Sequence, residues 1–227
     1  MTNQPVARQL RVREKLLTFG ADKLSDTELL AVLISSGSGK KSCIQLALDL
    51  LKHFGDLRAV LNADPSTFQT IPGIGIVRYV QLQAAREICR RSDFIYLQKN
   101  TTLTNTQQTC AYLKRQLRDK KNETVVGLFL DSQHRVIAYD ELFNGTINCA
   151  TIHPRPIIER TLQLNAAALI LAHNHPSGVA DESPQDRAVT KRLRDALELV
   201  DIKLLDHLII GDNEIYSIMS TTKWACH

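Results

Sequence analysis

The hydrophobic pattern changes character near residue 100, and this change restricts the fold more than any other feature of the sequence. Before it, apolar residues recur at the spacing of amphipathic helices. The helix-end signals there are the capping box Ser25–Glu28, the N-cap Ser42 and the terminating residues Gly20 and Gly55. After it, short apolar runs alternate with helical segments. We therefore expect a small all-α N-terminal domain over residues 1–100 and a mixed α/β domain over residues 101–227.

The N-terminal domain is expected to consist of short helices joined by Gly- and Ser-rich turns. The expected helical ranges are 10–19, 25–34, 42–54, 56–61, 65–68 and 76–91. In the second of these, the apolar face comprises Leu29, Leu30, Leu33 and Ile34. The polar residues 92–104 have little periodicity, and we interpret them as the linker to the second domain.

The C-terminal half shows strand and helix patterns in alternation. Strands are expected at 124–130, 135–142, up to about 150, 167–172, 203–210 and 214–219, with helices at 107–120, 155–164 and 184–199. Residues 131–134 read as a hairpin turn, and Asn144-Gly145 as a second turn. This alternation favours a sheet covered by helices.

Composition limits the class of protein and its location. No apolar run approaches the length of a membrane span, and residues 1–20 are too charged for a signal peptide, so we expect a cytoplasmic protein without a membrane partner. The five cysteines are scattered and contain no Cys-x-x-Cys pair, which favours neither a disulfide framework nor a thiolate metal site.

The charge is unevenly distributed along the chain. Residues 1–100 contain 14 Lys and Arg against 9 Asp and Glu, whereas residues 101–227 contain 14 against 15. A basic first half suits an anionic partner, and it equally suits a surface that is basic for solubility. Charge alone leaves both interpretations open.

The segment from His173 to Asp186 carries the clearest chemical signal. His173 and His175 follow the apolar run 166–172, and residues two apart in an extended segment point the same way, so both imidazoles can meet at one point. Asp186 can reach the same point if the Pro/Gly/Ser-rich loop between them turns back. Two histidines and one carboxylate leave a fourth position open, as in catalytic zinc sites.

Structural interpretations of the same residues are also available. Ser183, Pro184 and Asp186 form a good helix start by themselves, with a serine N-cap, proline at the first position and an acid at the third. A capped helix start is compatible with metal binding, because it would hold Asp186 rigidly. His207 follows Asp206 on an expected strand and is either a structural residue or a neighbour of the metal ligands.

Ile71-Pro72-Gly73-Ile74-Gly75 lies between two helical segments and resembles the helix-hairpin-helix family of DNA-binding motifs. Two glycines allow a tight backbone turn, and the N-terminus of the following helix offers free N–H groups to a phosphate. Gly73, Gly75 and Arg78 are the candidate nucleic-acid contacts, within a motif over residues 71–91. The alternative is a tight turn between helices that only packs.

His173-x-His175, seven further residues and Ser183-x-x-Asp186 fit the JAMM metalloprotease pattern of MPN-type domains. The wider context resembles the bacterial RadC family over essentially the whole chain. The segments that carry this resemblance are 171–178, 186–187, 205–207, 25–30 and 71–75. The family implies a mixed α/β, cytidine-deaminase-like C-terminal domain. Asn174 stands where many JAMM proteases have Ser or Thr, although the RadC branch shows Asn.

The resemblance also implies roles for individual residues. His173, His175 and Asp186 would bind one Zn²⁺ per chain, and water would fill the fourth position. Ser183 would stabilise the oxyanion of the tetrahedral intermediate. A glutamate from an earlier strand would be the general base. The candidates are Glu123, before a Gly-containing apolar strand as in the family pattern, and Glu141 as the second choice.

These features favour a zinc-dependent hydrolase of peptide or isopeptide bonds, with an unknown peptide or protein substrate. One alternative is a DNA-binding accessory factor in repair or recombination, which contacts the DNA backbone through residues 71–91 and has the MPN domain as a zinc-stabilised scaffold. Non-catalytic relatives typically lose a histidine or the aspartate, and the full ligand set here favours the enzyme.

Overall fold

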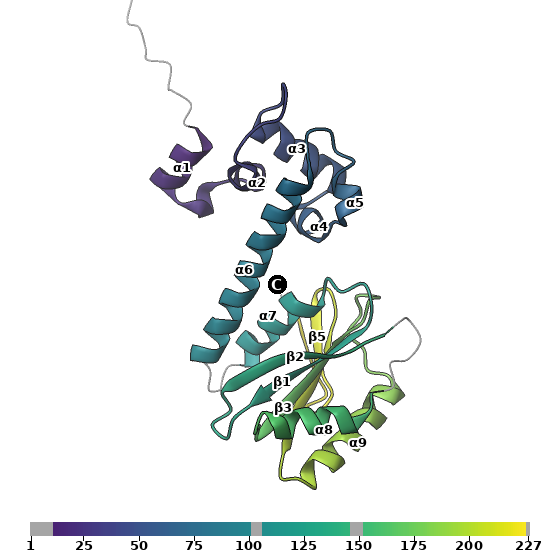
Figure 1. Cartoon of the computed structure of the whole chain (residues 1–227). Coiled ribbons are helices and arrows are strands. Elements are labelled where there is room, and N and C mark those ends of the chain that lie inside the picture. Colours follow the sequence, from purple (N-terminus) through teal and green to yellow (C-terminus); the bar gives the residue numbers. More distant parts are fainter. Residues whose placement is uncertain (1–10, 101–105, 146–151, 226–227) are drawn as a thin grey trace, which may run out of the picture. The chain divides into compact units, whose positions relative to one another are not determined.

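The computed structural model describes residues 11–100, 106–145 and 152–225 (Figure 1). The chain divides into two compact units, Met1–Cys89 and Arg90–His227. Helix α6 (Ile76–Asn100) spans the division between these units, so no break in the chain marks a domain boundary there. The boundary at residue 100 stays a prediction.

The first unit contains helices and one isolated β-bridge among its described residues. Besides the start of α6, its elements are α1 (Val12–Phe19), η1 (Ala21–Lys23), α2 (Asp26–Ile34), α3 (Cys43–Phe54), α4 (Leu57–Asn62) and α5 (Pro65–Phe68). The predicted capping box is confirmed: Glu28 N donates to Ser25 Oγ, and Ser25 N donates to Glu28 Oε2. Ser42 caps α3 by accepting from Gln45 N.

Two expectations for the helical region were wrong. Leu33 is 42% exposed, and Ala31 takes the predicted place of Leu33 in the core beside Leu30 and Ile34. The supposed linker from residue 92 is helical up to Asn100, because Phe94 and Leu97 pack into the core of the second unit. A polar sequence pattern did not reveal this tertiary stabilisation.

The second unit contains a six-stranded sheet with the order β2-β1-β3-β4-β5-β6. The strands are β1 (Thr124–Leu130), β2 (Val136–Asn144), β3 (Ala168–Asn174), β4 (Lys203–Ile210), β5 (Glu214–Ser217) and β6 (Thr222–Ala225). The helices that follow α6 are α7 (Thr106–Leu117), α8 (Pro154–Gln163) and α9 (Pro184–Glu198). β3 and β4 are parallel, whereas the other neighbouring pairs are antiparallel.

Helices cover both faces of this sheet (Figure 1). Val126, Leu128 and Leu130 of β1 pack in one core with α7, and the alternate residues Val125 and Phe129 pack in another core with α8 and α9. A residue of β1 or β3 on the second of these faces therefore points toward α8 and α9.

The mixed α/β prediction is confirmed for the described residues, and β1 and β4 have the predicted bounds. Several bounds differ: β5 ends at Ser217 and not at residue 219, and α7 ends at Leu117 and not at residue 120. β3 continues to Asn174, β2 continues to Asn144, where a turn was expected, and β6 was not predicted. Asn144 remains in the strand because it pairs with Thr124. The expected strand ending near residue 150 lies partly outside the described residues.

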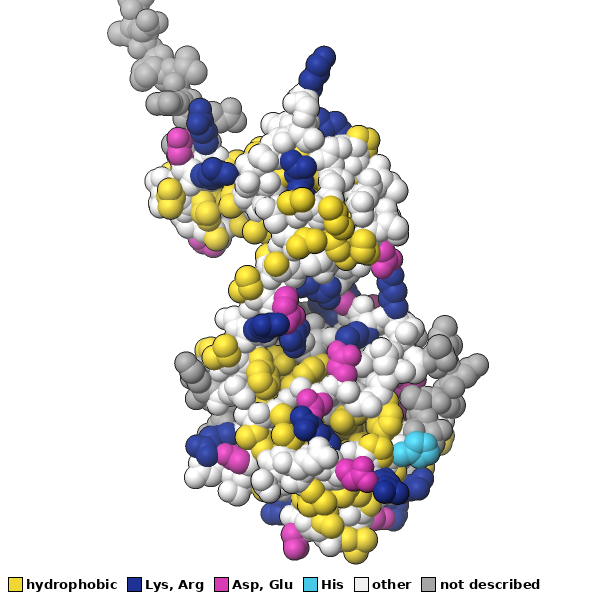
Figure 2. All heavy atoms as spheres, in the orientation of Figure 1, with side chains coloured by type: hydrophobic (Ala, Val, Ile, Leu, Met, Phe, Trp, Pro, Cys, Tyr) yellow, Lys and Arg dark blue, Asp and Glu magenta, His cyan; other side chains and the backbone are white. Residues whose placement is uncertain are grey.

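Among the helices of the described ranges, none has the length and apolar character that a membrane crossing requires. On the face drawn in Figure 2, acidic and basic side chains are interspersed with hydrophobic ones.

Candidate metal centre

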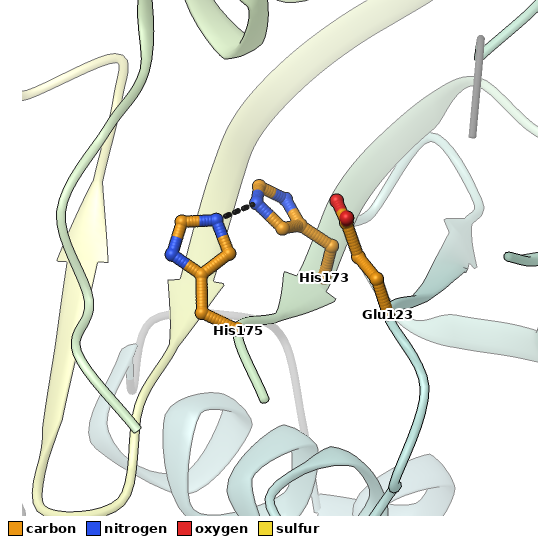
Figure 3. Close-up of side chains that lie close together, drawn as sticks. All are labelled: Glu123, His173 and His175. Atoms are coloured by element: carbon orange, nitrogen blue, oxygen red, sulfur yellow. Dashed lines mark hydrogen bonds between the residues drawn. The ribbon is translucent and has the colours of Figure 1, made fainter. Parts of the chain in front are cut away.

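The register of the central strands gathers the candidate site at one end of the sheet. β1 and β3 are antiparallel, and Val125 lies opposite His173. Glu123 precedes Val125 by two residues, so it shares its face of the sheet and comes level with His175. Figure 3 shows the side chains of Glu123, His173 and His175 close together. One potential ligand atom from each of the three lies within 4.8 Å of the other two.

The two histidine rings face each other through their Nε2 atoms, which are 3.1 Å apart (Figure 3). The other nitrogen of each ring is already engaged: His173 Nδ1 lies 2.8 Å from His207 Nε2, and His175 Nδ1 lies 3.0 Å from the carbonyl oxygen of Val179. A carbonyl only accepts, so the proton in the contact with Val179 is on Nδ1 of His175, and the neutral tautomer of this ring directs a lone pair from Nε2 toward His173.

This donor set fits a zinc ion. Two nitrogens that each lie 2.0–2.1 Å from a tetrahedral zinc are about 3.3 Å apart, close to the separation of the two Nε2 atoms. Two nitrogen lone pairs at such a distance repel each other unless a proton or a cation lies between them. His173 is fully buried, so water does not relieve this repulsion on its side.

Asp186 reaches the histidines from the first turn of α9. Its Oδ1 lies 3.5 Å from His173 Nε2, and its Oδ2 lies 4.0 Å from His175 Nε2. Ser183 caps the helix: its Oγ accepts from Asp186 N and donates to Asp186 Oδ2 at 2.6 Å, while Ser183 N also donates to Oδ2. The helix cap and the approach of the carboxylate to the histidines therefore occur together, as the sequence predicted.

Asn174, between the two histidines, holds the segment that carries Glu123. Its Oδ1 accepts from Thr124 N at 2.8 Å, and its Nδ2 donates to the carbonyl oxygens of Lys120 and Asn122. Asn174 and Thr124 are both buried. One side chain therefore fixes the backbone on either side of Glu123, a role that no sequence pattern indicated.

The second candidate for the base has a different environment. Glu141 lies on β2, and its carboxylate forms an ion pair with Lys120 at 2.6 Å. Among the described residues, Glu123 and not Glu141 belongs to the group of potential ligands around the histidines.

Burial governs the protonation of the site. It raises the pKa of Glu123, an effect that nearby Asp186 increases and nearby His175 opposes. It lowers the pKa of His173 to about 4 and that of His207 well below the usual histidine value. At neutral pH both rings are therefore neutral, the form in which histidine binds metals.

The N-terminal candidates are placed as a tight turn before α6. Gly73 has a φ of +90°, a conformation that favours glycine, and a Cβ there would lie 3.1 Å from Leu46 Cδ2, so this side chain would have to shift slightly. A Cβ at Gly75 would meet open space, with no such neighbour within 4 Å. The Arg78 guanidinium donates to the carbonyl oxygens of Gly73, Ser36 and Gly37, so it ties the turn to the preceding loop.

Fold and site thus define a mixed α/β protein in which two histidines and two carboxylates meet at one end of a central strand. Comparison with known proteins agrees with this description. Residues 103–224 match the RadC-like JAB domain family, and residues 4–80 match the UPF0758 N-terminal family.

Individual relatives extend over nearly the whole chain. A UPF0758 protein of Legionella pneumophila is 67% identical over 221 residues, which cover 97% of each chain. A UPF0758 protein of Halorhodospira halophila is 49% identical and covers 93% of this chain and 94% of its own length. One from Aliivibrio fischeri is 47% identical, with 96% and 97% covered. The chain belongs to the UPF0758 family of RadC proteins.

Proposed function

We propose that this protein is a zinc-dependent hydrolase of the JAMM type that cleaves a peptide or isopeptide amide bond. His173, His175 and Asp186 would hold one ion per chain, and Glu123 would be the general base. The observation that carries the proposal is the pair of Nε2 atoms 3.1 Å apart, with carboxylates of Asp186 and Glu123 beside them. Membership supports it too, because the JAB/MPN family includes metalloproteases.

The residues divide the chemistry between them. When bound, zinc supplies a Lewis acid that makes water nucleophilic near neutral pH and polarises the substrate carbonyl. The Glu123 carboxylate removes a proton from the attacking water and returns it to the leaving amine. Its raised pKa brings it closer to neutral pH, where a general base is most effective. Asn174 keeps this carboxylate directed at the site through the backbone of Thr124.

Ser183 is proposed as the donor to the oxyanion. Its hydroxyl proton lies toward Asp186 Oδ2 in this structure, so the oxyanion and this carboxylate oxygen compete for one donor. Rotation of the hydroxyl toward the substrate would leave Oδ2 with the backbone N–H of Ser183 as partner. The proposed switch of the donor therefore leaves Asp186 hydrogen-bonded.

The test combines metal analysis with substrate profiling of the full chain. Asp186→Asn keeps the size of the side chain and removes its charge, and we expect it to lose stoichiometric zinc. Glu123→Gln is expected to keep zinc and to lose about 100- to 10,000-fold in hydrolysis of a peptide and isopeptide library. Unchanged zinc content in Asp186→Asn, or a wild type without zinc, contradicts the proposal.

Glu141→Gln is the matched control for the base. It makes the same chemical change at a carboxylate that pairs with Lys120, and we expect activity within about twofold of wild type. Loss of zinc in Glu123→Gln would instead make Glu123 a fourth protein ligand. The proposed general-base role would then be wrong.

A second proposal is the accessory role in DNA repair or recombination, with the MPN domain as a zinc-stabilised scaffold. The open space around Gly75, at the start of α6, favours it, because a phosphate could approach the backbone there. Arg78 supports it less than its sequence position suggests, since three backbone carbonyls already occupy its guanidinium.

The DNA proposal has its own matched pair of variants. Gly75→Glu places a negative charge at an open position, and Gly75→Gln places a neutral side chain of the same length there. We expect Glu, but not Gln, to weaken salt-dependent binding to duplex DNA. Equal binding by both variants removes this site from consideration.

Two finer assignments complete the proposal. We propose a cytidine-deaminase-like arrangement of the second unit, supported by the helix-covered sheet with its parallel pair β3–β4 and by ligands at a strand end.

We also propose that the hydrolase acts in the cytoplasm. The free thiols of Cys43, Cys89 and Cys110 support this location, because reducing compartments maintain thiols.

A further inference from the structure

A buried chain of hydrogen bonds lies behind the candidate ligands. His173 Nδ1 contacts His207 Nε2 at 2.8 Å, and His207 Nδ1 contacts Thr190 Oγ1 at 2.6 Å. The Thr190 hydroxyl also lies 2.6 Å from the carbonyl oxygen of Asp186, one turn earlier in α9. His173, His207 and Thr190 are all buried. The hydrogen-bonded chain thus starts at the ring of one proposed metal ligand, His173, and ends at the backbone carbonyl of another, Asp186.

When both imidazoles are neutral, only one assignment of protons satisfies the three contacts. The carbonyl oxygen of Asp186 has no proton, so the hydroxyl proton of Thr190 must lie in the contact between these two oxygens. Thr190 Oγ1 then offers only lone pairs, and the proton in its contact with His207 must be on Nδ1. A neutral His207 therefore has an unprotonated Nε2, which accepts from the Nδ1–H of His173.

We propose that His207 and Thr190 are positioning residues that hold His173 in the tautomer protonated on Nδ1, so that its Nε2 lone pair faces the metal site. The metal in this statement rests on the proposed function, whereas the tautomer does not. A metal-binding histidine usually directs its second nitrogen to a carboxylate, a carbonyl or water. Here a second histidine, His207, takes that place, and it is itself held by Thr190 on the helix that carries Asp186.

A β-bulge places His207 in this chain. Leu169 pairs with Leu204, but Ile170 pairs with Asp206, so one residue of β4 is passed over. The shift brings His207 opposite Leu171, on the face of the sheet toward α8 and α9. Without the shift, alternation from Leu204 would have placed Asp206 on this face instead. The carboxylate of Asp206 instead accepts a hydrogen bond from the hydroxyl of Ser217, which lies 2.8 Å from Oδ1 and 2.7 Å from Oδ2.

The inference is tested first on the metal-free full chain labelled with ¹⁵N in its histidines. Long-range ¹H–¹⁵N NMR correlations distinguish protonated from unprotonated ring nitrogens. In the wild type we expect His173 to carry its proton on Nδ1. Thr190→Val keeps the shape of the side chain but removes the acceptor of His207 Nδ1–H. We expect the proton of His207 to move to Nε2 in this variant, which forces His173 into the opposite tautomer.

Thr190→Ser is the rescue variant, because it keeps the hydroxyl, and we expect the wild-type tautomer in it. Zinc affinity, measured by competition with a chromophoric chelator, is the second readout. We expect Thr190→Val to bind zinc about 10- to 100-fold more weakly than wild type, with Thr190→Ser within about threefold. His207→Gln, whose amide oxygen can accept from His173, should likewise bind more tightly than His207→Leu.

The outcomes separate the inference from the proposed function. A wild-type His173 protonated on Nε2 overturns the inference, whatever the protein binds. Equal zinc affinity in Thr190→Val and Thr190→Ser also overturns it, because a merely structural role of the side chain predicts that result. The proposed tautomer in a protein that binds no zinc overturns the proposed function and leaves the hydrogen-bonded chain in place.

Discussion

Asn174 provides a sharp test of how the site is held together. Asn174→Ala removes three hydrogen bonds, one from Thr124 N and two to the carbonyl oxygens of Lys120 and Asn122. Thr124 is fully buried, so its N–H is left without a partner, at a cost of about 1–3 kcal/mol. Each of the other two bonds contributes about 0.5–1.5 kcal/mol, part of which water recovers at the half-buried carbonyls. We expect a total destabilisation of about 2–4 kcal/mol.

Urea denaturation followed by tryptophan fluorescence measures this effect. The chain has a single tryptophan, Trp224, which lies in β6 and packs against the core of the second unit. Its signal therefore reports the unit that contains Asn174. Amide hydrogen exchange at Thr124 gives a local readout, and we expect it to accelerate in the variant.

Asn213→Ala is the matched control, since Asn213 is exposed in the turn between β4 and β5. We expect it to change stability by less than about 0.5 kcal/mol. If Asn174→Ala is equally mild, or if exchange at Thr124 is unchanged, the asparagine does not hold the segment of Glu123.

Three further predictions concern single residues. Gly73→Ala should destabilise the first unit by about 1–2 kcal/mol, because of its φ of +90° and the contact with Leu46, whereas Gly75→Ala should be nearly neutral by circular dichroism during urea denaturation. Ser183→Ala removes the helix cap and should lower the free energy of unfolding by about 1 kcal/mol, measured by tryptophan fluorescence during urea denaturation. It should also lower the zinc affinity. The folded-state pKa of His173 is depressed from 6.5 to about 4, so the unfolded chain binds the proton first as the pH falls. Between pH 6.5 and 4, the free energy of unfolding of the metal-free protein should fall by at most about 3 kcal/mol because of this group. His173→Asn should flatten that part of the plot of stability against pH.

Local sequence patterns predicted most elements, since their signals lie within a few residues. β1 and β4 are apolar runs between turns, and both have the predicted bounds. β6 is short and largely exposed, and it exists through pairing with β5, so its own residues predicted little. The last turns of α6 likewise depend on Phe94 and Leu97 packing against distant residues.

The candidate site shows the same division. The spacing of His173 and His175 in an extended segment was enough to predict that their rings meet, because alternation is a local property of extended chain. The capping pattern of Ser183 and Asp186 was equally local. The choice between Glu123 and Glu141 does not follow from a local pattern, because it depends on the register between β1 and β3 and on the ion pair of Glu141 with Lys120.

The sequence by itself determined most of the elements and the donor atoms at the end of β3, because both depend on patterns within a few residues. Only the tertiary structure decided which residues contact and orient these donor groups. Asn174 meets a segment 50 residues away, and a bulge that no local pattern indicates turns His207 toward His173. Such contacts depend on register and on helix placement, which many weak interactions along the chain set together.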